Sequence, residues 1–113
     1  MLRTYYPFIP IPSSTPGFDV VLSTGSTLNA IENSSGRQWL SGPTGKSIRL
    51  SETSGVDYRV AMGTSTVDAA LTGSMLVLGG VVEVFNVPAG GYISIMTTST
   101  AISTVNVALG YGQ

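Results

Sequence analysis

Hydrophobic and polar residues alternate in short runs along much of this chain, and Gly, Ser, Thr or Pro separates one run from the next. The clearest case is residues 46–52, KSIRLSE, where Ile48 and Leu50 alternate with polar side chains. A period of two residues is typical of a β-strand with one buried and one exposed face. The same reasoning predicts strands at residues 18–24, 57–62, 67–72, 74–78, 81–87, 92–95 and 104–109.

The strongest β signal lies in residues 79–96, GGVVEVFNVPAGGYISIM. Val, Ile, Phe and Tyr dominate both halves of this segment, and Pro88 followed by Ala89 and two glycines separates them. Proline fixes φ for a turn, and glycine adopts positive φ without steric cost. We therefore predict a β-hairpin with Phe85 in the core, where Phe85→Ala would cost about 3–5 kcal/mol.

Glu83 is the unusual charge in this segment, because it alternates with Val81, Phe85 and Val87 on a face that should be apolar. It is either paired or located at an interface, or it lies on an edge strand whose register or bulge turns it outward. The pattern favours neither alternative.

About eight short strands with turn residues between them predict an all-β fold, an antiparallel β-sandwich or jelly roll. No helix is expected, because the helix-compatible stretch at residues 67–71 is short and is flanked by Thr and Gly. A break at Gly25 and Ser26, followed by residues 27–31, indicates a kinked or bulged strand.

Residues 1–16, MLRTYYPFIPIPSSTP, contain four of the six prolines and are expected to form an extended arm before a single domain at 17–113. The apolar residues of the arm favour docking, on a neighbouring subunit or on the domain's own sheet, over a disordered tail. We hypothesise that the folded domain starts near Phe18 and that the arm crosses to another subunit or to a partner surface. The residues expected to bind there are Tyr5, Tyr6, Phe8, Ile9 and Ile11.

Charged residues make up only 10 % of the chain, and five basic against six acidic residues leave a net charge of -1. The basic residues are scattered, which argues against nucleic-acid binding. Together with 42 % hydrophobic residues, the low charge favours a surface largely covered by other subunits. No apolar run approaches the roughly 18 residues of a membrane helix, and prolines interrupt the opening segment, so a soluble, unsecreted chain is expected.

The sequence lacks Cys and His, which removes thiolate nucleophiles, His-based general bases and the usual zinc ligands. Gly45-Lys46-Ser47 ends like a P-loop, but that motif requires glycine where Leu40 stands and a helix where residues 48–50 indicate a strand. The acidic residues are spread singly and are interpreted as solvated surface or turn residues: Asp19, Glu32, Glu52, Asp57, Asp68 and Glu83. We predict no enzymatic activity, cofactor, metal site or small-molecule substrate.

Trp39 lies in the polar stretch at residues 32–45, ENSSGRQWLSGPTG, and is expected to be half buried. A lid over one end of the core is favoured over a contact with a partner, but both interpretations stay open. Trp39 and Glu83 are therefore the candidate interface residues outside the arm.

Four segments of the second half of the chain form a recognisable set: residues 58–63 (YRVAMG), 81–90 (VVEVFNVPAG), 92–95 (YISI) and 105–112 (VNVALGYG). Together they resemble segments of small virion proteins of tailed bacteriophages. The resemblance covers roughly half of the chain, from Tyr58 on, and points to the capsid decoration, or cement, family. It implies a small β-sandwich or jelly-roll protein that forms a homotrimer, binds the major capsid protein and stabilises the outside of the virion capsid. Such a protein is soluble in the host cytoplasm before assembly.

The alternative function is a carbohydrate- or receptor-binding β-sandwich module of a phage tail or fibre. Sugar sites combine exposed aromatic rings with nearby carboxylates and amides, and the cluster of this kind in the sequence is Trp39 with Glu32, Arg37 and Gln38. The low charge of the chain suits the decoration function better.

Overall fold

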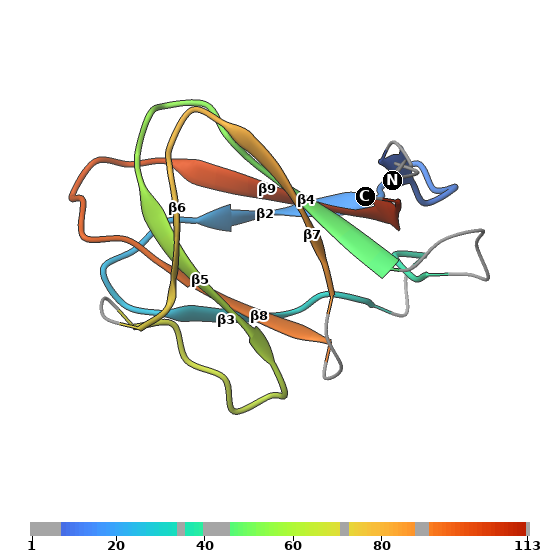
Figure 1. Ribbon diagram of the computed structural model, residues 1–113, viewed down its shortest axis with the longest axis horizontal. Helices are drawn as coiled ribbons and strands as arrows, with labels where there is room; N and C mark the ends of the chain where they lie inside the picture. Colours follow the sequence, from blue (N-terminus) through green and yellow to red (C-terminus); the bar gives the residue numbers. More distant parts are fainter. Residues whose placement is uncertain (1–7, 34–35, 40–45, 71–72, 88–90, 113) are drawn as a thin grey trace, which may run out of the picture.

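The computed structural model describes residues 8–33, 36–39, 46–70, 73–87 and 91–112, and these residues form strands without a helix. The strands are β1 (Ile9–Pro10), β2 (Gly17–Val21), β3 (Thr27–Ala30), β4 (Lys46–Glu52), β5 (Tyr58–Gly63), β6 (Met75–Val77), β7 (Val82–Asn86), β8 (Tyr92–Met96) and β9 (Thr104–Tyr111). They make two antiparallel sheets that face each other (Figure 1). The predicted all-β sandwich is therefore confirmed.

The order of the strands explains how the chain builds this sandwich. One sheet has the order β1-β9-β4-β7, with β2 also paired to β9, and the other has the order β3-β8-β5-β6. The pairs β5–β6, β4–β7, β3–β8 and β2–β9 are nested around the β5–β6 connection. This is the winding of an eight-stranded jelly roll, in which a long antiparallel ribbon rolls up into two sheets.

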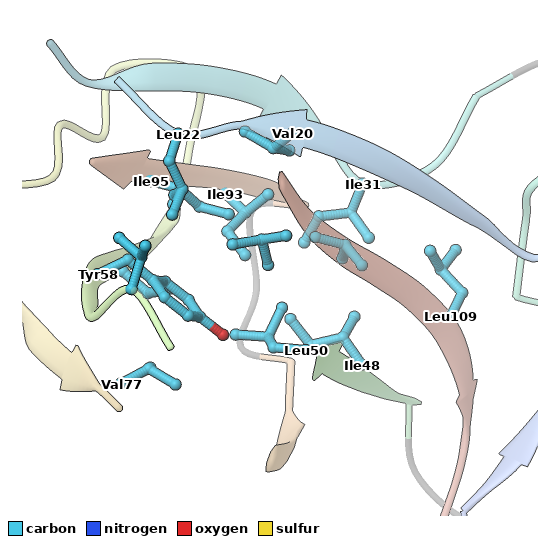
Figure 2. Close-up of a cluster of buried hydrophobic side chains, with 14 of the residues drawn as sticks. Val20, Leu22, Ile31, Ile48, Leu50, Tyr58, Val77, Ile93, Ile95 and Leu109 are labelled. Carbon is cyan, nitrogen blue, oxygen red and sulfur yellow. The ribbon is translucent and has the colours of Figure 1, made fainter. Parts of the chain in front are cut away.

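The core lies between the two sheets and is built from the inward-facing positions of their strands. Ile48 and Leu50 of β4 and Ile93 and Ile95 of β8 are almost completely buried there. Figure 2 shows Tyr58 of β5 in the same layer, with its hydroxyl directed towards Leu50. The alternation in residues 46–52 thus predicted both the strand β4 and its buried face.

The predicted hairpin at residues 79–96 is wrong, although both of its strands exist. β7 pairs with β4 in one sheet, whereas β8 lies between β3 and β5 in the other. The expected turn at residues 88–90 lies outside the described residues. Because β7 is an edge strand, Phe85 packs against the core only partly buried. The cost of Phe85→Ala stays a prediction.

Two further expectations about strands are corrected. The break at Gly25 and Ser26 is no bulge within one strand, because β2 before it and β3 after it belong to different sheets. Of the strand predicted at residues 67–72, the described part is a loop, which contacts β8 where the Ala69 N–H donates to Ser94 Oγ at 2.9 Å. Val67 favours a strand, but Asp68, Ala69 and Ala70 are residue types that strands contain less often, so the strand prediction here had little local support.

The second half of the predicted arm belongs to the domain itself. In β1, Ile9 pairs with Tyr111 and Pro10 pairs with Gly110, and the Ile11 N–H donates to the Leu109 carbonyl at 3.0 Å. The side chain of Ile11 is 3 % exposed and belongs to the core cluster. The folded domain therefore starts before Gly17, because the edge of β9 offers a hydrogen-bonding partner that the sequence pattern did not reveal.

Candidate functional site

A groove opens along one side of the sandwich, between the edge strands β6 and β7 of the two sheets. We call it the β6–β7 groove; it has a volume of about 290 Å³ and is lined by Met75, Leu76, Val77, Leu78, Glu83 and Phe85. Both strands pair on one side only, β6 with β5 and β7 with β4. Among the described residues, no further strand lies between the two sheets at this groove, which is therefore an open side of the sandwich.

The groove has an unusually apolar rim. Of its lining residues, Leu76 is 50 % exposed, Leu78 is 57 % exposed and Met75 is 37 % exposed. Val82 of β7 is 59 % exposed, but it is opposite Ser51 and therefore leaves the sheet on the outer face. Soluble monomers rarely gather so many large apolar residues on one side without a function for them.

Glu83 lies at the mouth of this groove. In the ladder between β4 and β7, Glu83 is opposite Leu50, so its side chain leaves the sheet on the inner face. It is nevertheless exposed, because none of the described strands lies beyond β7 in this sheet. The structure thus places Glu83 on an edge strand, as one alternative held, but without a bulge or register that turns it to the outer face. Its role at an interface stays a prediction.

Three further large apolar residues are exposed on strands away from the groove. They are Ile9 on β1, Val21 on β2 and Leu28 on β3, which are 50 %, 61 % and 41 % exposed. Val21 is opposite Thr104 and Leu28 is opposite Ser94, positions that alternate with the core residues of β9 and β8, so the two side chains leave the sandwich on the outer faces of different sheets. These residues therefore do not form one surface.

The described residues of the arm have three different environments. Ile11 is buried in the core, Phe8 is half buried, and Ile9 on β1 is exposed. Phe8 lies against Gly110, where any side chain would collide with the Phe8 ring, and the Arg49 guanidinium is 5.7 Å from the centre of that ring. Ile11 thus cannot bind a partner as predicted, while Tyr5 and Tyr6 lie outside the described residues.

Trp39 covers one end of the core, as the favoured interpretation held. Its ring is partly buried against the core cluster, and Nε1 donates a hydrogen bond to the Gly110 carbonyl at 2.7 Å. The ammonium group of Lys46 lies 5.5 Å from the centre of the ring. Whether Trp39 also contacts a partner stays a prediction.

The cluster proposed for sugar binding uses its polar groups within the molecule. The Arg37 guanidinium donates to the carbonyls of Ile31 at 2.6 Å and Ala30 at 3.3 Å, and it stacks on the Phe18 ring at 4.0 Å. Desolvation by these surroundings lowers the pKa of Arg37.

In the same cluster, Glu32 Oε1 accepts a hydrogen bond from the backbone N–H of Trp39 at 2.8 Å. Two of the groups that a sugar would need are therefore already engaged in holding the loop. The cluster is therefore a structural part of this end of the sandwich. The Gln38 side chain is exposed.

At the other end of the sandwich, a buried carboxylate, that of Glu52, connects several loops. The sequence analysis interpreted this residue as solvated surface or a turn residue. Glu52 ends β4 and is 2 % exposed. Its oxygens accept hydrogen bonds from the N–H groups of Ser54 at 2.9 Å, Gly55 at 2.9 Å, Val56 at 3.1 Å and Gly80 at 2.9 Å, and from the Ser103 hydroxyl. Three loops, β4–β5, β6–β7 and β8–β9, thus converge on one side chain at the left end of Figure 1.

The surroundings of Glu52 keep it ionised. Burial alone raises the pKa of Glu52, but the Ser103 hydroxyl and the backbone N–H groups outweigh it, and the net pKa lies below its usual range. The sequence did contain a signal for this position, because Glu52 continues the buried alternation of Ile48 and Leu50 and precedes a Ser-Gly turn.

Tyr58 is the second ionisable group of the core. Burial raises its pKa, and the negative charges of Glu52 and Glu83 raise it further. Within the described part of the chain, the buried Tyr58 hydroxyl has no hydrogen-bond partner. The Tyr58 phenol therefore stays protonated at neutral pH, and its ring contributes to the packing of the core.

The P-loop-like segment forms a strand from Lys46 on, as the sequence predicted. The Ser47 side chain is buried, and its hydroxyl hydrogen-bonds to the Gly112 carbonyl and to Asn86 Oδ1.

Among the described residues, no three acidic side chains lie close enough together to hold a metal ion, and no helix has the length and apolar character needed to cross a membrane.

Comparisons with known proteins add no relative to this picture. No family model matches the sequence, and no curated protein and no solved structure matches the chain.

Proposed function

We propose that this chain is a structural virion protein, a trimeric decoration protein that binds and stabilises the outside of a tailed-phage capsid. The observation that carries the proposal is the number of large apolar residues that are exposed on a sandwich with little charge, several of them at the β6–β7 groove. A surface of this kind suits a protein whose sides are covered in an assembly.

The fold supports this proposal by analogy alone. Jelly rolls occur in viral capsid proteins and also in lectins, and a fold by itself does not determine function. The engagement of Arg37 and Glu32 in internal hydrogen bonds favours the virion function over sugar binding, because a glycan would have to displace them.

Within this proposal, the capsid contact is assigned to the first residues of the chain. Since Ile11 is in the core and Phe8 is tied to Gly110, the remaining candidates for this contact are Tyr5, Tyr6 and the exposed Ile9. A short aromatic segment next to a proline loses little conformational entropy on docking, so it can add affinity beyond that of the compact domain.

The test combines the molar mass of the purified chain with binding to empty heads made from the major capsid protein of the same genome. Light scattering should give the mass of a trimer, and the chain should sediment with the heads. Deletion of residues 2–7 should abolish sedimentation while the thermal midpoint stays within a few degrees. The substitution Ile102→Ser, at a residue that is 90 % exposed in the β8–β9 loop, serves as the control and should change neither property.

The proposal fails if the full chain does not sediment with the heads. Binding on a glycan array at that point would establish the sugar-binding alternative instead. If the deletion variant sediments like the full chain, the first residues are a passive tail and another surface contacts the capsid.

A further inference from the structure

The sheet that contains β9 carries a pocket that the proposed function does not use. We call it the Arg49 pocket; it has a volume of about 350 Å³, and its lining includes Phe8, Pro10, Pro16, Arg49, Asn106 and Ala108. This volume lies at the lower end of the range of about 300–1,000 Å³ that is typical of sites for small ligands.

The pocket arises because two strands share one edge of β9. β2 pairs with residues 104–108 of β9, β1 pairs with residues 110–111, and the chain between β1 and β2 leaves the sheet. Pro10 ends β1 and Pro16 precedes β2, so the two prolines flank the opening along β9. Because proline fixes φ, these walls are largely preorganised for a ligand.

The floor of the pocket is a row of positions across three strands. Gly17 of β2, Ala108 of β9 and Arg49 of β4 lie opposite one another, so they belong to the same face of the sheet. Val107 and Leu109 alternate with this row and belong to the core, so the row faces outward. The two small residues leave the space, and the long side chain of Arg49 borders it.

The Arg49 guanidinium lacks the internal partners of the other described arginines. Arg37 donates to two backbone carbonyls, and Arg59 Nη1 donates to the Ser74 carbonyl at 3.0 Å. Arg49 is exposed and makes neither a hydrogen bond nor an ion pair within the described part of the chain. It lies over the Phe8 ring, 5.7 Å from the ring centre. Such a contact orients the planar group and leaves its N–H donors free.

These groups define the ligand that the pocket would recognise. A guanidinium with free donors binds a carboxylate through two parallel hydrogen bonds, which is the strong geometry for such pairs. The Phe8 ring and the two prolines present apolar surface beside it. A carboxylate that is attached to a small apolar group therefore matches both parts of the pocket.

The far side of the pocket determines where the carboxylate lies. Asn106 borders the pocket there, and its Nδ2 donates to Asp19 Oδ1 at 2.9 Å. The negative charge of Asp19 repels an anion, so the ligand's carboxylate belongs at Arg49 and not at Asn106. A phosphate, with its higher charge, would meet stronger repulsion than a carboxylate.

We propose that the Arg49 pocket binds a carboxylate attached to a small apolar group, with Arg49 holding the carboxylate and Phe8, Pro10 and Pro16 enclosing the apolar group. Two sources supply this chemistry, an acidic side chain of a partner protein and a free organic acid. The first source rests on the proposed function, because the capsid protein would provide the side chain. The chemistry of the pocket does not rest on it.

The test titrates the purified full chain with three probes and follows backbone amide shifts by nuclear magnetic resonance. Benzoate has both the carboxylate and the apolar ring, benzamide has the same shape without the charge, and acetate lacks the ring. Benzoate should bind saturably with a Kd of about 1–10 mM and should shift the amides of Gly17, Arg49 and Ala108. Benzamide and acetate should each bind at least about ten-fold more weakly.

Two matched variants assign the binding to Arg49. Arg49→Gln removes the charge of the pocket and should weaken benzoate at least about ten-fold, while the weak binding of benzamide stays unchanged because the walls are intact. Arg59→Gln makes the same change outside the pocket and should leave the affinity for benzoate unchanged. Arg49 is exposed, so the thermal midpoint of Arg49→Gln should stay close to that of the wild type. If it melts early, Arg49→Lys replaces it, which keeps the charge but loses the planar fork and should still weaken benzoate.

Three outcomes overturn the proposal. The first is a wild type that shows no saturable shifts with benzoate, or shifts that lie away from the pocket. The second is benzamide binding as tightly as benzoate. The third is a folded Arg49→Gln variant that keeps the wild-type affinity for benzoate.

Sedimentation with empty heads distinguishes the two sources of the carboxylate. If the capsid protein supplies it, Arg49→Gln should sediment with the heads less than the wild type and Arg59→Gln do, and excess benzoate should compete. If Arg49→Gln sediments like the wild type, the source is a free organic acid. If the wild type itself does not sediment with the heads, the proposed function fails, and the benzoate titration still decides on the pocket.

Discussion

Glu52 and Glu83 lie on neighbouring strands of the same sheet, β4 and β7, but at very different positions in the fold. Glu52 is 2 % exposed and accepts hydrogen bonds from three loops, whereas Glu83 is exposed at the mouth of the β6–β7 groove. One carboxylate closes an end of the sandwich, and the other borders a side that the chain leaves open.

The difference teaches that satisfied hydrogen bonds, and not distance from the surface alone, decide what a carboxylate does in this protein. A buried charge without partners destabilises a fold, while one with several N–H donors fixes the backbone that supplies them. The Glu52 end is therefore expected to be the rigid part of the sandwich, and the groove side the part available for contacts.

The largest expected effect is that of Glu52→Ala. It leaves the N–H groups of Ser54, Gly55, Val56 and Gly80 without their acceptor, and the expected loss is about 3–5 kcal/mol in the free energy of unfolding. The matched control is Glu83→Ala, which should change stability by less than about 0.5 kcal/mol. Urea titrations measure both, and equal losses in the two variants would contradict the comparison.

A smaller effect is expected from Ile11→Ala, which tests the part of the arm that joins the core. Ile11 is 3 % exposed, so the loss should be about 2–4 kcal/mol, whereas Ile9→Ala should cost less than about 1 kcal/mol because Ile9 is 50 % exposed. Thermal melts followed by circular dichroism distinguish the two variants. A loss below about 1 kcal/mol for Ile11→Ala would mean that the domain folds without its first strand.

Lowering the pH should reproduce part of the loss in unfolding free energy that is expected for Glu52→Ala. Since the pKa of Glu52 is lowered in the folded state, its carboxylate contributes stability above its ordinary pKa of about 4.3, and this contribution is lost as the pH falls through the lowered pKa. The difference in unfolding free energy between wild type and Glu52→Gln should therefore shrink from pH 7 towards pH 3. A difference that stays constant over this range would show that the pKa of Glu52 is not lowered.

The smallest effect is expected from Tyr58→Phe. The hydroxyl is buried and makes no hydrogen bond to the described residues, so its removal should leave stability unchanged or raise it by up to about 1 kcal/mol. The variant should also lose less stability than the wild type above pH 10, because the raised pKa of Tyr58 makes ionisation unfold the wild type. A loss of more than about 1 kcal/mol at pH 7 would reveal a partner for the hydroxyl.

Short-range patterns were enough to locate most strands. The alternation of Ile48 and Leu50 predicted β4 with its observed bounds, and the β-branched residues on both sides of Pro88 predicted β7 and β8. These patterns extend over about two to six residues, and the extended conformation and buried face of a strand depend on residues within the same short distance. The all-β class followed directly from them.

The candidate site was only partly visible in the sequence. Glu83 stood out because it interrupts an apolar face, and the structure places it at the mouth of the groove. Leu76, Leu78 and Val82 gave no comparable signal, since apolar residues in a strand-like run indicate burial by default. Their exposure depends on β6 and β7 being edge strands.

The sequence by itself determined where this chain is extended, where it turns, and which side chains within a strand share a face, because each of these depends on neighbouring residues. The tertiary structure alone decided that β7 and β8 belong to different sheets, that Ile11 enters the core beside β9, and that Glu52 receives donors from three loops. Pairing partners such as β2 and β9 are more than 80 residues apart, as the hydrogen bond between Asp19 and Asn106 illustrates. No local pattern encodes such a choice, because it depends on which edges and faces the rest of the folded chain leaves to be covered.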